Sequence, residues 1–152
     1  MTRKLALEDL SVGDTFESAE HVMEADAIIA FASEFDPQPF HTDPVAAKDS
    51  FFGTLVASGW HTGAVSMRLL TESLPFEHGV IGSGGPLTWA SPVYPGDALR
   101  VLTRIEEIVP SRSKPGRARV VVHCQTVDQA GEVKQDFRPN LMVWSRDVDP
   151  QG

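Results

Sequence analysis

Residues 51–74 of this 152-residue chain are FFGTLVASGWHTGAVSMRLLTESL. The part from Gly59 to about Ser73 predicts an α-helix in which Arg68 and Glu72 are the only Asp, Glu, Lys or Arg residues. A helix that is apolar on most of its sides is usually buried. We therefore expect this helix at the centre of the fold, with the rest of the chain packed around it.

The sequence after residue 86 predicts strands. Apolar and polar residues alternate over 99–106, 120–127 and 133–143, and Leu87–Val93 is expected to be a fourth, less regular strand. The side chains expected to face the core are Leu99, Val101, Thr103, Ile105, Val120, Val122, Cys124, Thr126, Val133, Phe137, Leu141 and Val143. The polar face of the last strand is expected to carry Lys134, Asp136, Arg138 and Asn140. Short glycine-containing turns connect the strands, so the sheet is expected to be antiparallel.

The residues before the central helix predict one strand and two helices. The strand is Thr15–Val22, the longer helix is Glu24–Phe35, and a short helix, Val45–Lys48, follows Asp43 as its N-cap. Leu74–Pro86 is rich in glycine and proline and is expected to be a loop. Helices first and strands later predict an α+β fold, with a long antiparallel sheet lying across the buried helix.

Length and composition limit the classes of function. A chain of 152 residues is expected to form one domain, 1–152, with residues 147–152 as a frayed tail. The formal net charge is −8 and no basic block is present, which argues against nucleic acid as a partner. A single cysteine excludes an intrachain disulfide, and no apolar run approaches the ~20 residues of a membrane span. We expect a cytoplasmic protein that does not bind membranes.

The segment Phe35–Asp43, FDPQPFHTD, carries an acid and an imidazole, Asp36 and His41. Such a pair suits general acid–base catalysis. Pro37 and Pro39 are expected to keep the segment from being helical, and five extended residues span roughly 16 Å, so the segment must fold back before the side chains meet. The alternative is that both residues only cap or pack.

The central helix begins with Ser58-Gly59-Trp60-His61. Free N–H groups at a helix N-terminus can bind an oxyanion, and glycine allows a ligand to approach closely. From the pattern alone, an ordinary Ser58 N-cap is the favoured interpretation. His61 is expected to be structural rather than catalytic.

Other candidates are weaker. The glycine-rich residues 82–86 lack the third glycine and the following helix of a phosphate loop. The five histidines are scattered, so no metal site is expected. Cys124 is placed on the apolar face of a strand, which argues against a nucleophile. Lys114, Arg117 and Arg119 form a local basic cluster, and a solvated hairpin end is favoured over an anion contact.

Several blocks, in order, resemble the MaoC-like hydratase/dehydratase family, the (R)-specific enoyl-CoA hydratases with the hotdog fold. These blocks are LEDLSVGDTF, EADAIIAFASEFDPQPFHTD, FFGTLVASGWHT and SPVYPGDALRV, which span most of residues 7–105. The second resembles the family's catalytic segment Asp-x-Asn-Pro-x-His-x-Asp. The third resembles the entry into its central helix.

The resemblance implies a hotdog fold, a long sheet wrapped around the central helix, and a homodimer whose sheets join edge to edge, with further assembly of dimers left open. It implies that Asp36 and His41 activate water for reversible addition to a trans-2-enoyl-CoA, giving a (R)-3-hydroxyacyl-CoA. The N–H of Gly59 would hold the thioester carbonyl. The CoA thioester is then the substrate, and no cofactor is expected.

The chain departs from the family pattern at two positions: Gln38 stands where asparagine is usual, and Ser58 stands where histidine is frequent. Side chains with a possible role in shaping the acyl pocket, or alternatively in the ordinary core, are Phe40, Phe51, Phe52 and Trp60. Two other functions stay open at this point. One is a hotdog acyl-CoA thioesterase, and the other is a non-catalytic acyl-CoA-binding protein.

Overall fold

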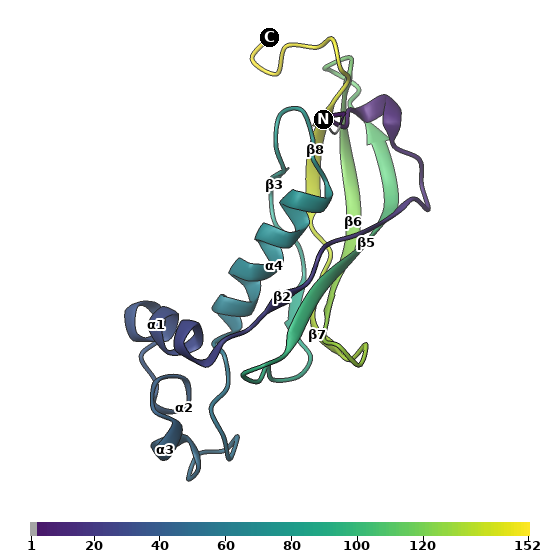
Figure 1. The fold of residues 1–152 in the computed structure, drawn as a ribbon. Coiled ribbons are helices and arrows are strands. Elements are labelled where there is room, and N and C mark those ends of the chain that lie inside the picture. Colours follow the sequence, from purple (N-terminus) through teal and green to yellow (C-terminus); the bar gives the residue numbers. More distant parts are fainter. Residues whose placement is uncertain (1–2) are drawn as a thin grey trace.

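In the computed structural model, which describes residues 3–152, the central helix α4 spans Gly59–Ser73, as predicted. Ser58 is its N-cap, and the Ser58 hydroxyl accepts a hydrogen bond from the backbone N–H of Trp60 at 3.2 Å. The buried residues of α4 are His61, Thr62, Val65, Ser66, Leu69 and Leu70. Figure 1 shows this helix lying across one face of a long, curved sheet.

The sheet is built from antiparallel ladders in the order β1-β5-β6-β7-β4, with β2 paired to β5 and β8 paired to both β3 and β6. The strands are β1 (Thr15–Glu17), β2 (His21–Val22), β3 (Ile81–Gly82), β4 (Leu87–Trp89), β5 (Ala98–Pro110), β6 (Arg117–Val127), β7 (Val133–Phe137) and β8 (Asn140–Trp144). The predicted class, an antiparallel sheet wrapped around a buried helix, is confirmed.

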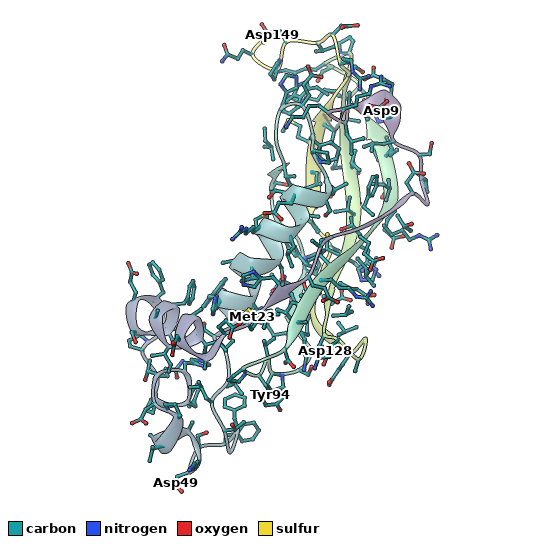
Figure 2. All side chains as sticks on the ribbon, in the orientation of Figure 1. Asp9, Met23, Asp49, Tyr94, Asp128 and Asp149 are labelled. Carbon is teal, nitrogen blue, oxygen red and sulfur yellow. The ribbon has the colours of Figure 1, made fainter. Side chains whose placement is uncertain are left out.

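Strands β5 and β6 form the centre of the sheet, and their predicted inward faces are buried. The residues concerned, each exposed by 5% or less, are Leu99, Val101, Thr103, Ile105, Val120, Val122, Cys124 and Thr126. Their alternation with more exposed neighbours follows from the two-residue period of a strand. Side chains fill the space between this face and α4, as Figure 2 shows.

Three predictions about the strands need correction. The predicted strand Thr15–Val22 is interrupted, because the Ser18 hydroxyl takes the N–H of Val101 at 2.8 Å in place of a ladder bond. The predicted loop Leu74–Pro86 contains the short strand β3. The predicted strand over 133–143 divides into β7 and β8 around Pro139, which has no N–H to donate.

Lys134 is not on an exposed polar face, as the alternation predicted, but is 2% exposed. The register between β6 and β7 shifts here, because Thr126 pairs with Gln135 whereas the next residue, Val127, pairs with Val133. Such a bulge breaks the simple alternation of faces. As a result Lys134 and Gln135, although adjacent, are both buried.

The N-terminal half contributes a short 3-10 helix, η1 (Leu7–Asp9), and the helices α1 (Ala25–Phe35), α2 (Pro39–Thr42) and α3 (Pro44–Ala47). Helices α1 to α3 lie beyond the N-terminal end of α4, at the lower left of Figure 1. The prediction that the segment between Asp36 and His41 cannot be helical is wrong for α2. Pro39 occupies the first turn of that helix, where a missing N–H is tolerated.

Across residues 3–152, none of the helices combines the length and the apolar character needed to cross a lipid bilayer.

Candidate active site

The end of α1 and the single turn of α2 bring Asp36 and His41 together. Asp36 follows α1 as its C-cap, and Gln38 is extended, as expected for a residue before proline. Helix α2 then turns the chain back, so that the His41 Nε2 atom lies 3.3 Å from the Asp36 Oδ2 atom. The fold-back that this pair required is therefore made by a helical turn and not by an extended loop.

A backbone carbonyl orients the buried imidazole of His41. Its Nδ1 atom lies 2.6 Å from the carbonyl oxygen of Val56, and a carbonyl oxygen only accepts hydrogen bonds. Nδ1 therefore carries a proton and donates a hydrogen bond to the Val56 carbonyl. This leaves Nε2, the nitrogen that faces Asp36, as the atom that can take up or release a proton.

The carboxylate of Asp36 is held in its charged form. Its Oδ1 atom accepts a hydrogen bond from Gln38 Nε2 at 2.6 Å. Burial raises the pKa of the Asp36 carboxyl, but hydrogen bonds from Gln38 and from the Ser58 hydroxyl, together with the charge of His41, lower it by more. The pKa therefore lies below its ordinary value of 3.8, and Asp36 is an anion at neutral pH.

Gly59 provides a free donor beside this pair. Among the hydrogen bonds formed by residues 3–152, none uses the N–H of Gly59, whereas those of Trp60, His61 and Thr62 all bond to Ser58. The N–H groups of the first turn of a helix attract negative charge. An oxygen that gains charge during a reaction has a donor available here.

Only glycine fits at position 59. A Cβ atom there would lie 2.5–2.7 Å from three atoms of the Trp89 indole ring, which packs directly against the glycine. Trp89 is held in turn by a hydrogen bond from its Nε1 to Gln135 Oε1 at 3.0 Å. The glycine thus permits a close contact with Trp89, which sequence reasoning did not anticipate.

One cleft of about 560 Å³ is lined by Asp36, His41, Gly59, Trp60 and Trp89. The other lining residues include Gln38, Phe51, Phe52, Ala57, the segment 90–93 and Lys134. Phe40 does not line the cleft: it packs against the core, with its ring centroid 4.6 Å from that of His41. Ser58 is fully buried. Its hydroxyl lowers the pKa of Asp36 and caps the N-terminus of α4.

Lys134 also lines this cleft, and its ammonium group is held by several partners. Its Nζ atom donates to the carbonyl oxygen of Pro92 at 2.9 Å and lies 3.7 Å and 3.6 Å from carboxylate oxygens of Asp97 and Asp128. Figure 2 places Asp128 and Tyr94, whose ring Lys134 approaches at 5.2 Å, at the same end of the sheet. A buried ammonium is stable only with such partners. Nothing in the sequence around Lys134 indicated that its side chain would be buried among these partners.

A second, apolar cavity of about 340 Å³ lies between α4 and the sheet. Its lining includes Ala64, Met67, Leu70, Leu87, Val101, Cys124 and Phe137. It has two residues in common with the cleft, Trp60 and Trp89.

The remaining sequence candidates lie elsewhere. His61 is buried away from the cleft and stacks on Phe31 with ring centroids 4.6 Å apart. Burial, and then the charge of His21, lowers the pKa of His61. Cys124 is buried, and burial raises its pKa to about 11, so it is not a ready nucleophile. Within residues 3–152, no three His, Cys, Asp or Glu side chains are arranged to hold a metal ion.

Comparison with known proteins assigns the family. The model of the MaoC like domain matches residues 9–127, and the chain belongs to this family. A crystal structure of the MaoC-like dehydratase from Rhodospirillum rubrum is 53% identical, with a TM-score of 0.92 over 95% of this chain and 99% of that one. The hotdog fold that the resemblance implied is thereby confirmed.

Two curated relatives are more distant. The uncharacterized protein YdeM of Bacillus subtilis (strain 168) is 30% identical over 120 residues, which cover 78% of this chain and 85% of YdeM. A 3-hydroxybutyryl-CoA dehydratase of Methylorubrum extorquens (strain ATCC 14718 / DSM 1338 / JCM 2805 / NCIMB 9133 / AM1) is 30% identical over 128 residues. These cover 84% of this chain and 78% of that protein.

Proposed function

We propose that this protein is a hydro-lyase that adds water reversibly to a trans-2-enoyl-CoA and gives a (R)-3-hydroxyacyl-CoA. The observation that carries the proposal is the Asp36–His41 pair, 3.3 Å apart, in one cleft with the unpaired N–H of Gly59. Membership of the MaoC-like family and the dehydratase names of two relatives support the same reaction class.

The pair supplies the proton transfers. A water molecule in contact with Asp36 and His41 loses a proton to Nε2 of His41, and its oxygen attacks the β-carbon of the enoyl thioester. Asp36 stays anionic, orients the water and stabilises the imidazolium that forms. The proton then passes from Nε2 to the α-carbon, so one water is added in total and the pair is restored. These steps use protein side chains alone and need no cofactor.

Gly59 supplies the charge stabilisation. As the β-carbon is attacked, negative charge collects on the thioester oxygen, and the N–H of Gly59 would donate a hydrogen bond to it. Such a donor lowers the barrier by about 3 kcal/mol when it bonds the charged oxygen more strongly than the ground-state carbonyl.

A second copy of the chain is proposed to complete the molecule. Strand β4 is the end strand of the sheet order, and every residue from 81 to 90 is exposed, including Ile81, Leu87 and Trp89. An apolar strand with one free edge tends to pair with another strand. We propose that two β4 edges pair antiparallel in a homodimer. Light scattering should give twice the mass of one chain.

The test is to incubate the purified protein with crotonyl-CoA and to analyse the products by mass spectrometry, with a thiol reagent in a parallel sample. Hydration predicts a product heavier by one water, loss of the conjugated thioester absorbance and no free thiol. Chiral analysis should give the (R) product. Thiol release without a hydroxyacyl product would replace the proposal by a thioesterase. Tight binding with no turnover on any enoyl-CoA tried would replace it by a binding protein.

A further inference from the structure

Two tryptophans separate the cleft that holds Asp36 and His41 from the apolar cavity beneath α4. Both Trp60 and Trp89 line both spaces, and they are the two residues that the spaces share. Their rings meet edge to face, with centroids 5.1 Å apart and planes at 83°. We call these two residues the indole wall. The cleft and the cavity therefore adjoin at this wall.

Trp89 is the fixed part of the wall. Its ring rests on Gly59, so closely that no side chain fits there, and its Nε1 donates to Gln135 Oε1 at 3.0 Å. Gln135 is 4% exposed and belongs to strand β7, which lies between β6 and the end strand β4. A buried amide that is already paired holds its partner strongly, because breaking the bond leaves a polar group unsatisfied. The indole of Trp89 is therefore anchored and does not merely fill space.

Trp60 is the looser part of the wall. It lies in the first turn of α4 and is 65% exposed, and no hydrogen bond of its indole nitrogen is formed with residues 3–152. Its edge-to-face contact with Trp89 contributes a free energy typical of such aromatic pairs. Opening the wall thus depends chiefly on Trp89 and on its bond to Gln135.

The position of the wall relative to the reacting atoms has a consequence for the substrate. The thioester oxygen must reach the N–H of Gly59, and the indole of Trp89 lies against the same residue. In a crotonyl group one carbon extends beyond the reacting β-carbon, whereas each longer chain adds carbons that point further from the pair. Carbons that extend from the cleft towards the apolar cavity would meet the indole wall first.

We infer that the indole wall makes this protein selective for short acyl thioesters, with Trp89 and Gln135 as the residues that determine specificity. The inference rests on the proposed hydration reaction and adds the substrate class to it. A longer chain is bound only when Trp89 leaves Gln135, so the native cavity does not contribute its apolar surface to long substrates. Removing the indole should open the cavity, where each methylene that becomes buried improves binding about fourfold.

The experiment compares crotonyl-CoA with trans-2-octenoyl-CoA as substrates of the wild type, Trp89→Ala and Gln135→Met. The readout is the ratio of kcat/KM for the eight-carbon over the four-carbon substrate. We expect a low ratio for the wild type, an increase of at least about tenfold for Trp89→Ala and a smaller increase for Gln135→Met. Trp144→Phe, a change at a tryptophan of strand β8 remote from both spaces, is the control and should keep the wild-type ratio.

A binding measurement separates this inference from the proposed function. The saturated butyryl-CoA and octanoyl-CoA cannot be hydrated, and calorimetry gives their relative affinities without any chemistry. Tighter binding of octanoyl-CoA by Trp89→Ala than by the wild type supports the wall even if no turnover is found. An unchanged preference in both assays overturns the inference, and a wild type that already prefers the eight-carbon thioester does so as well. If crotonyl-CoA is hydrated in either case, the proposed function stands.

Discussion

His41 and His123 each lie beside an aspartate, and the difference between their surroundings is the reason to propose only the first pair as an acid–base site. His123 Nε2 is 2.8 Å from Asp136 Oδ2, which is closer than the 3.3 Å between His41 and Asp36. The groove beside His123, at about 740 Å³, is also larger than the cleft at His41. Neither distance nor volume therefore marks the site.

The partners of the two rings make the distinction. Both nitrogens of His123 face carboxylates, because Glu106 Oε1 lies 3.7 Å from Nδ1, and Arg138 and Gln125 in turn donate to Glu106 and Asp136. This cluster joins strands β5, β6 and β7 on the face of the sheet away from α4. At His41 a carbonyl occupies Nδ1, and Nε2 faces Asp36 in the cleft that Gly59, with its unpaired N–H, also lines. In the His123 cluster both ring nitrogens face carboxylates. In the His41 cluster one ring nitrogen faces a carboxylate, and the cleft also contains an unpaired N–H.

The largest effect should come from removing the acid–base groups. We expect Asp36→Asn and His41→Gln each to lower kcat/KM for crotonyl-CoA by about 10³-fold, because general acid–base catalysis contributes on that scale. The matched changes Asp136→Asn and His123→Gln should leave kcat/KM within about twofold of the wild type. Steady-state kinetics measure all four. Equal losses at both pairs would contradict the distinction drawn between them.

The donor at Gly59 should give the next largest effect. Gly59→Ala would place a methyl group 2.5–2.7 Å from the Trp89 ring, displacing the ring or the helix end, and kcat is expected to fall by about 10²-fold. Gly82→Ala is the matched control, since its methyl group would meet only Leu141 and a carbonyl oxygen, at 3.3–3.4 Å. Circular dichroism should show that both variants are folded. Full activity in Gly59→Ala would show that catalysis does not depend on the close packing of Trp89 against the first turn of α4.

A smaller effect concerns the pH dependence of activity. The hydrogen bond from Gln38 is one of the interactions that lower the pKa of Asp36, so Gln38→Leu should raise that pKa. The acidic limb of the kcat/KM profile should then move to higher pH, because Asp36 becomes protonated sooner as the pH falls. Gln125→Leu removes the equivalent bond to Asp136 and should not move the profile. An unmoved limb in Gln38→Leu would show that Asp36 does not control it.

The smallest effect is on stability. Burial raises the pKa of Asp136, but hydrogen bonds from His123 and Gln125 and the charges of His123 and Arg138 lower it by more. A lowered folded-state pKa stabilises the protein above the ordinary value of 3.8, and this stabilisation is lost as the pH falls through the folded value. Asp136 is 35% exposed, so solvent screens the pair and Asp136→Asn should cost no more than about 1 kcal/mol at neutral pH. Urea unfolding should find this cost at pH 7 and a smaller one near pH 3.

The sequence predicted those parts of the fold that depend on neighbouring residues. The limits of α4, the inward faces of β5 and β6 and the Asp43 cap of α3 follow from periods of two or 3.6 residues and from local capping. One error arose where a distant contact changed a local pattern, because the register shift between β6 and β7 buried Lys134. Another was local, because Pro39 occupies the first turn of α2, where proline is tolerated.

The candidate site shows the same division. Asp36, His41 and Gly59 were identified from their types and from ordered blocks that resemble a family, whereas Trp89 and Lys134 were missed because nothing near them in the chain indicates their contacts. Trp89 reaches Gly59 only through the placement of β4 beside the start of α4. Lys134 reaches Pro92 across 42 residues of sequence.

By itself the sequence determined a buried helix, a sheet with one apolar face, and an acid and an imidazole separated by two prolines, because each of these depends on residues close together in the chain. Only the tertiary structure decided that the Val56 carbonyl accepts a hydrogen bond from Nδ1 of His41, that Gly59 keeps a free N–H and that two indoles lie between the cleft and the apolar cavity. These features are contacts between segments far apart in the chain. Strand register and helix packing bring those segments together, and no local sequence pattern predicts the contacts.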